Sequence, residues 1–225
     1  MRAPLYMALA ALIVSCSSPE PVRYPVPTTP VSNLPTSTVP PQGPFKPNAN
    51  LYVCNNIRIS NRPAATPSGQ IINYAAMVVA NGVVLAAAPA NDVCMTSGFG
   101  PRFGRMHKGI DLQSRPAGTI YSAGPGIIRE VSVVSGFGNQ VLIDHGNGVF
   151  TRYGHLASFA PGLAAGQRIG FGQPLGMMGQ TGNATAVHVH YEILTGNYNT
   201  PKKSWGLTAN NPLDFPAWAG LDTSS

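Results

Sequence analysis

Four of the five histidines suit a catalytic metal site. His107 and Asp111 stand four residues apart, and His188 and His190 stand two apart in a strand-like run. Because alternate residues of a strand point to one face, His188 and His190 are expected on the same side of a sheet. Two histidines and a carboxylate are the ligand set of many catalytic zinc sites, which keep a fourth position open for water. Bound zinc acidifies that water and polarises a carbonyl, and amide hydrolysis requires both effects.

The fourth histidine, His155, follows a predicted strand and has the chemistry of a general acid–base. Taken singly these motifs are weak, since paired histidines on a strand surface are common and short motifs often match by chance. A structural zinc site is disfavoured because such sites use four protein ligands, typically with cysteines, and no cysteine is near these histidines in the sequence. The occurrence of all the patterns in one β-rich region favours metal-dependent catalysis.

Short β-strands are predicted to position these residues. Met77–Ala80 and Val83–Ala86 flank Asn81-Gly82, a pair that accepts the positive φ angles of a type I′ hairpin turn. No stretch predicts an amphipathic helix of more than two turns, so we predict a mostly β fold with a compact antiparallel sheet. Further strands are predicted by β-branched or alternating runs at Ile127–Val134, Gln140–Ile143, Val149–Tyr153 and Val187–Leu194.

Three segments, in order along roughly residues 95 to 195, resemble the motifs of the lysostaphin/LytM-type zinc peptidases. They read SGFGPR at 97–102 with HKGID at 107–111, IDHGNG at 143–148 with TRYGHL at 151–156, and GQTGNAT at 179–185 with HVHYE at 188–192. The resemblance implies a compact β-sheet peptidase core with a groove, preceded here by a short N-terminal β extension. It also implies zinc-dependent hydrolysis of peptide bonds in peptidoglycan stem peptides or cross-links.

The resemblance assigns roles to five residues. It implies that His107, Asp111 and His190 bind Zn²⁺ and that His155 and His188 are the catalytic bases. One base would take a proton from the water that attacks the peptide carbonyl, and the other would stabilise the oxyanion. Which bond is cut, and whether the enzyme is an endopeptidase or a carboxypeptidase, stays open at this point.

Three further positions are read from the same resemblance. His145 matches a position that is common in the family without being a ligand, and we interpret it as a turn histidine. Ala186 and Val187 stand where the family usually has Gly or Ser and a variable residue. The loop before His188 is therefore expected to differ from the family without loss of a ligand.

Other functions are less favoured by the same residues. Some LytM-type domains have lost their ligands and act as non-catalytic activators of cell-wall amidases, but all five site positions are intact here. A sugar-cutting enzyme is disfavoured because no closely placed pair of carboxylates stands out. Nucleic acid is an unfavoured partner because the basic residues behind the net charge of +6 are scattered, and a weak attraction to acidic cell wall is the more modest interpretation. The sequence indicates no oligomeric state.

Residues 1–16 are predicted to be a lipoprotein signal peptide. Arg2 precedes Leu5–Val14, an apolar stretch of ten residues that is too short to span a bilayer. It leads into Cys16, and the sequence IVSC resembles a lipobox, whose cysteine is cleaved and acylated. An ordinary signal peptide with an incidental cysteine is the alternative. By the same resemblance, Ser17 in place of Asp favours an outer-membrane lipid anchor facing the periplasm.

The rest of the chain divides into four parts. Residues 17–50 contain ten prolines in 34 positions and are predicted to be a disordered tether. Residues 51–94 are predicted to be a small β subdomain of unknown role, residues 95–215 the peptidase domain, and residues 216–225 a C-terminal tail. The subdomain is compatible with a substrate-facing role, an extra β-layer or an inhibitory cover, the last with Asn50, Asn55 or Asn56 on the zinc.

Cys54 and Cys94 are predicted to form a disulfide. An exported chain passes through an oxidising compartment, where an even pair of cysteines usually becomes bonded. A bond that closes a loop of this length would stabilise the fold by roughly 4 kcal/mol. Zinc ligation by this pair is disfavoured because neither cysteine has a CxxC partner.

Overall fold

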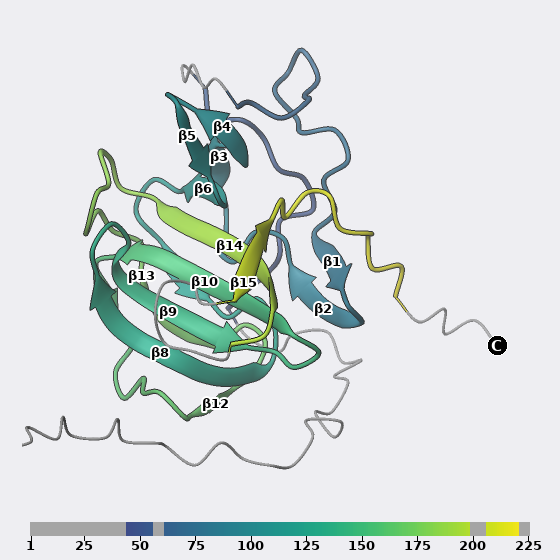
Figure 1. Cartoon of the computed structure of the whole chain (residues 1–225). Helices are drawn as coiled ribbons and strands as arrows, with labels where there is room; N and C mark the ends of the chain where they lie inside the picture. The colour runs from purple at the N-terminus through teal and green to yellow at the C-terminus, as the bar shows by residue number, and fades with distance from the viewer. Residues whose placement is uncertain (1–43, 56–60, 199–205, 221–225) are drawn as a thin grey trace, which may run out of the picture. The chain divides into compact units, whose positions relative to one another are not determined.

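The computed structural model describes residues 44–55, 61–198 and 206–220 (Figure 1). No helix occurs among these residues, and none of them forms a helix that is long and apolar enough to cross a membrane. The predicted signal peptide, Cys16 and most of the predicted tether lie outside the described residues. The strands are β1 (Met77–Ala80), β2 (Val83–Ala86), β3 (Cys94–Ser97), β4 (Gly100–Arg102), β5 (Arg105–His107), β6 (Ile110–Gln113), β7 (Thr119–Tyr121), β8 (Gly126–Val134), β9 (Gly138–Asp144), β10 (Val149–Leu156), β11 (Ser158–Phe159), β12 (Arg168–Ile169), β13 (Pro174–Met177), β14 (Val189–Gly196) and β15 (Leu207–Asn210).

The largest sheet has the strand order β12-β8-β9-β10-β14-β6-β3, and β15 also pairs with β14. All these pairings are antiparallel, and Figure 1 shows β8, β9, β10 and β14 lying side by side. Every residue of β10 and the first six residues of β14 are buried. A strand with one face in solvent would alternate between buried and exposed residues, so these two strands are covered on both faces. The antiparallel β fold predicted from the sequence is confirmed.

The predicted Asn81-Gly82 hairpin is present as β1 and β2. Asn81 has φ 45° and Gly82 has φ 79°, as a type I′ turn requires. A second hairpin, β4–β5, turns at Phe103-Gly104, where both residues also have positive φ. Phenylalanine is uncommon in that conformation, which is why the sequence pattern did not indicate this turn.

The N-terminal extension (residues 51–94, of which 51–55 and 61–94 are described) shares its hydrophobic core with the large sheet. Leu51, Val53 and Ile71 belong to the same buried cluster as Ile110 and Tyr191. The described part of residues 51–94 therefore has no hydrophobic core separate from that of the large sheet. Cys54 and Cys94 are joined by a disulfide with their Cα atoms 5.0 Å apart, within the range that such a bond spans.

The folded part of the chain extends beyond both of its predicted ends. Phe45, which lies inside the predicted tether, is fully buried, and its ring stacks on Tyr121 at 4.9 Å between centroids. At the other end, the backbone of Pro216 and Trp218 hydrogen-bonds to β1, inside the predicted tail. Single apolar residues in proline-rich surroundings carry no periodic pattern, so the sequence did not indicate these long-range contacts.

His145 is a buried residue of the β9–β10 turn, as the turn interpretation expects. Its Nδ1 lies 2.7 Å from the Pro125 carbonyl oxygen, and its Nε2 lies 2.7 Å from the Thr151 hydroxyl. That hydroxyl lies 2.9 Å from the hydroxyl of Tyr153. Burial lowers the pKa of His145 to about 4 against smaller opposing contributions from Pro125 and Asp144, so the imidazole is neutral near pH 7.

Candidate metal centre

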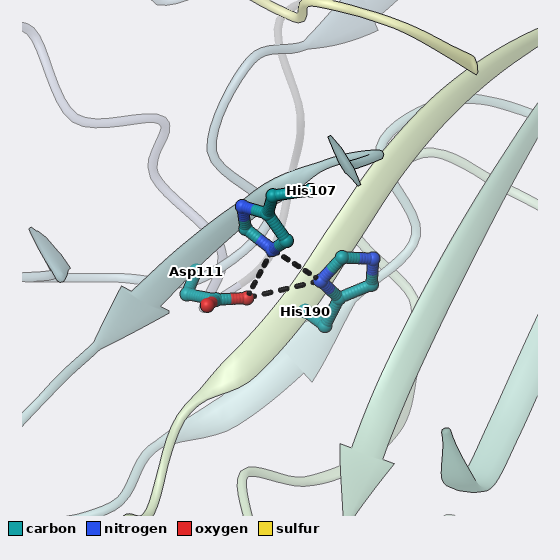
Figure 2. Close-up of side chains that lie close together, drawn as sticks. All are labelled: His107, Asp111 and His190. Atoms are coloured by element: carbon teal, nitrogen blue, oxygen red, sulfur yellow. Dashed lines mark hydrogen bonds and ion pairs between the residues drawn. The ribbon is translucent and has the colours of Figure 1, made fainter. Parts of the chain in front are cut away.

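Three side chains converge at the junction of β5, β6 and β14 (Figure 2). His107 Nε2 lies 3.0 Å from His190 Nδ1, and Asp111 Oδ1 lies 3.1 Å from His107 Nε2 and 3.0 Å from His190 Nδ1. All three residues are buried, and their ligand atoms lie within 4.8 Å of one another. A single small ion placed among them could contact one atom of each residue.

Strand register and one glycine set this arrangement. His190 of β14 lies opposite Asp111 of β6 in the antiparallel pair, so both side chains project to the same face. Gly109 stands between His107 and Asp111, and an added Cβ there would lie 2.3 Å from the Tyr191 carbonyl oxygen. Only glycine allows the chain between His107 and Asp111 to approach β14 this closely.

Hydrogen bonds orient the two imidazoles towards the common centre. His107 Nδ1 lies 2.6 Å from the Gly98 carbonyl oxygen, which can only accept, so Nδ1 carries the proton and Nε2 presents a lone pair. His190 Nε2 lies 3.1 Å from Glu192 Oε1 and donates to that carboxylate, so its Nδ1 faces the centre. Once the proton on His190 Nδ1 is displaced, two nitrogen lone pairs and one carboxylate oxygen meet at one point, and this donor set suits a divalent cation such as zinc.

The electrostatics of the centre also favour positive charge. Burial would lower the pKa of His190, but hydrogen bonds to Asp111 and Glu192 and the charges of both carboxylates raise it to about 9. Burial would raise the pKa of Asp111, but the hydrogen bonds and charges of His107 and His190 hold it well below its usual value. A proton is thus strongly held at the point where a metal ion would bind.

A buried ion pair stands behind His190. Glu192 is fully buried, and its Oε2 accepts a hydrogen bond of 2.7 Å from Arg152 Nη1 on the neighbouring strand β10. The Arg152 guanidinium also lies over the Phe137 ring, 4.8 Å from its centroid. Burial would raise the pKa of Glu192, but His190 and Arg152 lower it, so the carboxylate stays ionised beside His190.

The other two histidines of the predicted site lie beside this centre. The ring centroids of His155 and His188 are 4.7 Å apart, and His188 Nε2 lies 3.6 Å from Asp111 Oδ1. His155 Nδ1 donates to the Thr181 carbonyl oxygen at 2.8 Å, and His188 Nδ1 donates to the Ala186 carbonyl oxygen at 2.8 Å. Both imidazoles are thereby left with Nε2 unprotonated in the neutral form, which is the state a general base requires.

His155 is held in a strained backbone conformation. It has φ 65°, which a residue with a side chain rarely adopts, and it sits where the register of β10 on β9 shifts. Burial lowers its pKa to about 4, with the nearby charges of His188 and His190 acting in the same direction. Such strained residues concentrate at functional sites, and this one presents a neutral imidazole.

Residues 105–202 match the sequence profile of peptidase family M23. This region is an M23 peptidase domain. The match includes all five histidine and aspartate positions described above.

Two sets of relatives resemble the M23 domain. The peptidoglycan DD-endopeptidase ShyA of Vibrio cholerae is 38% identical over 89 residues, which is 39% of this chain and 20% of ShyA. The DD-carboxypeptidase/endopeptidase Mpg of Neisseria meningitidis is 39% identical over 88 residues, again 39% of this chain and 20% of the relative. The chain thus spans about a fifth of the length of these relatives. A solved zinc-containing peptidase from Vibrio cholerae has a similar fold, with a TM-score of 0.51 at 24% identity over 63% of this chain and 46% of that one.

The M23 domain brings all five sequence-predicted site residues together. One detail differs: β14 begins at Val189, so His188 lies just before the strand rather than within it. It is placed by a backbone bridge to Gly179, whose carbonyl oxygen accepts from His188 N at 3.0 Å. The two imidazoles of the His-x-His pair are therefore held by different elements, which fits two different roles.

Three residues around the M23 centre were not singled out from the sequence. Glu192 continues the alternation of His188 and His190, so the period of two was the signal that could have found it. Arg102 donates from Nη1 to Asp111 Oδ2 at 2.9 Å, and its place in the SGFGPR motif was the only hint. Asn61 lies outside every motif and had no signal.

Proposed function

We propose that the protein is a zinc metalloendopeptidase that hydrolyses peptide bonds in peptidoglycan and so remodels cell wall. The observation that supports this best is the convergence of two imidazole nitrogens and a carboxylate beside two further imidazoles. The names of the relatives ShyA and Mpg, which describe peptidoglycan peptidases, favour this substrate. A domain that only activates an amidase would have no need for the complete set.

Each residue has a role in this reaction. His107, Asp111 and His190 would hold zinc, with Glu192 orienting His190 from behind. When bound, zinc would supply a Lewis acid that polarises the scissile carbonyl and acidifies water. Either His155 or His188 accepts a proton from the attacking water, since both present an unprotonated Nε2. The other, in its protonated form, donates from Nε2 to the oxyanion. The proton taken from the water then passes to the leaving amine.

We also propose that the protein is exported and held to a bacterial outer membrane through a lipid on Cys16. The signal-like residues 1–16 support this proposal. A fatty-acid label should enter the wild-type protein and be absent from Cys16→Ala, and an unlabelled wild-type protein would contradict the proposal.

Purified protein incubated with wall fragments tests the activity. Released muropeptides are identified by mass spectrometry, with and without a zinc chelator, and zinc is then restored. We expect only the zinc-loaded protein to cut cross-linked peptides. The masses of the fragments will identify the bond that is cut. If the protein by itself cleaves nothing but speeds cleavage by an added amidase, the result would support the non-catalytic activator instead. New reducing sugar ends that the chelator does not prevent would support a sugar-cutting enzyme.

A further inference from the structure

Asn61 lies outside the M23 match yet touches the groups behind two metal-binding residues. Its side-chain Nδ2 donates to the Gly98 carbonyl oxygen. The same oxygen accepts from His107 Nδ1 at 2.6 Å. A carbonyl oxygen has two lone pairs and can serve both donors, so Asn61 and His107 share one backbone acceptor.

The other end of the Asn61 amide leads to Asp111. Ser97 Oγ donates to Asn61 Oδ1 at 3.2 Å. Arg102 Nη1 donates to Ser97 Oγ at 2.6 Å and to Asp111 Oδ2 at 2.9 Å. One side-chain amide therefore connects to both His107 and Asp111, by two separate sets of hydrogen bonds.

The backbone around Asn61 is held tightly against β3. An added Cβ on Gly98 would lie 2.5 Å from the Asn61 carbonyl oxygen, so the approach depends on glycine at position 98. Just upstream, Cys54 N donates to the Met95 carbonyl oxygen at 2.9 Å, and the Cys54–Cys94 disulfide fixes the same edge. The extension thus contacts β3 near both ends of that strand.

We infer that Asn61 is a positioning residue for the metal centre, and that the N-terminal extension braces this centre. By holding the Gly98 carbonyl and the Ser97 hydroxyl in place, it fixes the orientation of His107 and, through Arg102, that of Asp111. Both polar atoms of its side chain are engaged with residues 97–98, which sets this role apart from an inhibitory asparagine on the metal. The inference rests on the proposed zinc-dependent function.

Zinc affinity of the full mature chain tests the inference. We expect Asn61→Ala to bind zinc about 3- to 10-fold more weakly, somewhat less than the effect of removing a group that contacts a ligand directly. Competition with a chromophoric chelator gives the dissociation constant, and the visible spectrum of the Co²⁺-substituted protein reports the geometry at the metal. Gly98→Ala, which pushes the Asn61 backbone away without altering its side chain, should weaken binding similarly.

Asn91→Ala is the matched control. Like Asn61, Asn91 uses both polar atoms of its side-chain amide: its Nδ2 donates to the Pro44 carbonyl oxygen at 2.7 Å, and its Oδ1 accepts from Lys46 N at 2.9 Å. We expect it to lower the stability of the metal-free protein about as much as Asn61→Ala does, while zinc affinity and the Co²⁺ spectrum stay unchanged. Two results would overturn the positioning role of Asn61 but not the proposed function: wild-type zinc affinity in Asn61→Ala, or an equal loss of zinc affinity in Asn91→Ala. A wild-type protein that binds no zinc would overturn the proposed function.

Discussion

His190 and His107 direct ring nitrogens at one point from two differently built regions. His190 comes from the central strands, where a buried carboxylate, Glu192, accepts its outer proton and Arg152 of β10 balances that charge. His107 comes from the β4–β5 hairpin, whose tip residue Phe103 is 86% exposed, and its outer proton goes to a neutral carbonyl, that of Gly98.

The difference separates two ways of orienting a ligand. On the His190 side, strand register sets the geometry, and a charge strengthens the ligand. On the His107 side, the acceptor is backbone, so its position depends on the neighbours that hold it. We therefore expect changes on the first side to act mainly through charge and changes on the second side mainly through position.

Removal of either proposed ligand, His190 or His107, should have the largest effect, and here the two sides should behave alike. His190→Ala and His107→Ala each leave two of three ligands, so we expect loss of bound zinc and wall hydrolysis at background level. Elemental analysis of zinc per protein, at matched circular dichroism, measures this. A His190→Ala protein that keeps its zinc would show that the assignment of the His-x-His pair is reversed.

The two outer histidines should lose rate while keeping metal. His155→Ala and His188→Ala remove a general acid–base, so we expect rates on wall fragments to fall about 10²–10⁴-fold with zinc content close to wild type. Loss of zinc from His188→Ala would make it a ligand, and unchanged rates in both variants would exclude the catalytic assignment.

Charge on the His190 side can be removed without a change of shape. In Glu192→Gln the carboxylate behind His190 is lost, so we expect zinc affinity to fall about 10- to 100-fold, more than for Asn61→Ala on the other side. Asp144→Asn is the control, since Asp144 pairs with Arg129 at 2.6 Å outside the centre. If Glu192→Gln and Asn61→Ala lower zinc affinity by the same factor, the two sides do not differ in the way described, with charge acting on the His190 side and position on the His107 side.

The smallest expected effect concerns His145, a buried histidine outside the centre, whose protonation changes the free energy of unfolding with pH. The folded-state pKa of His145, about 4, lies below its unfolded value, so the unfolded chain binds the proton first as pH falls. His145 should therefore contribute a loss of about 2 kcal/mol in the free energy of unfolding between pH 7 and pH 5, levelling off below pH 4. Urea unfolding of the chelated protein at both pH values should show a smaller loss in His145→Asn, and an equal loss would contradict the assignment.

Sequence patterns predicted the parts of this molecule that are governed locally. The Asn81-Gly82 hairpin follows from turn chemistry, and the strands around β8, β9 and β10 follow from β-branched runs, with ends that differ by a few residues. The five site residues were assigned through motif resemblance, because the register that places His190 opposite Asp111 cannot be read from either strand alone. Phe45 and Asn61 were missed because each depends on partners far along the chain, 37 residues away for the Asn61 contact with Gly98.

The order of the proposed ligands along the chain would link metal supply to folding. His107 and His190 are 83 residues apart, and the long strands β8, β9 and β10 all lie between them. An ion held at both ends would act as a removable cross-link around these strands, present only in the folded chain. At a free zinc concentration 100-fold above the dissociation constant, it would add about 2.7 kcal/mol to the free energy of unfolding. The lifetime of the protein against proteolysis would then depend on zinc in its surroundings as well as on its sequence.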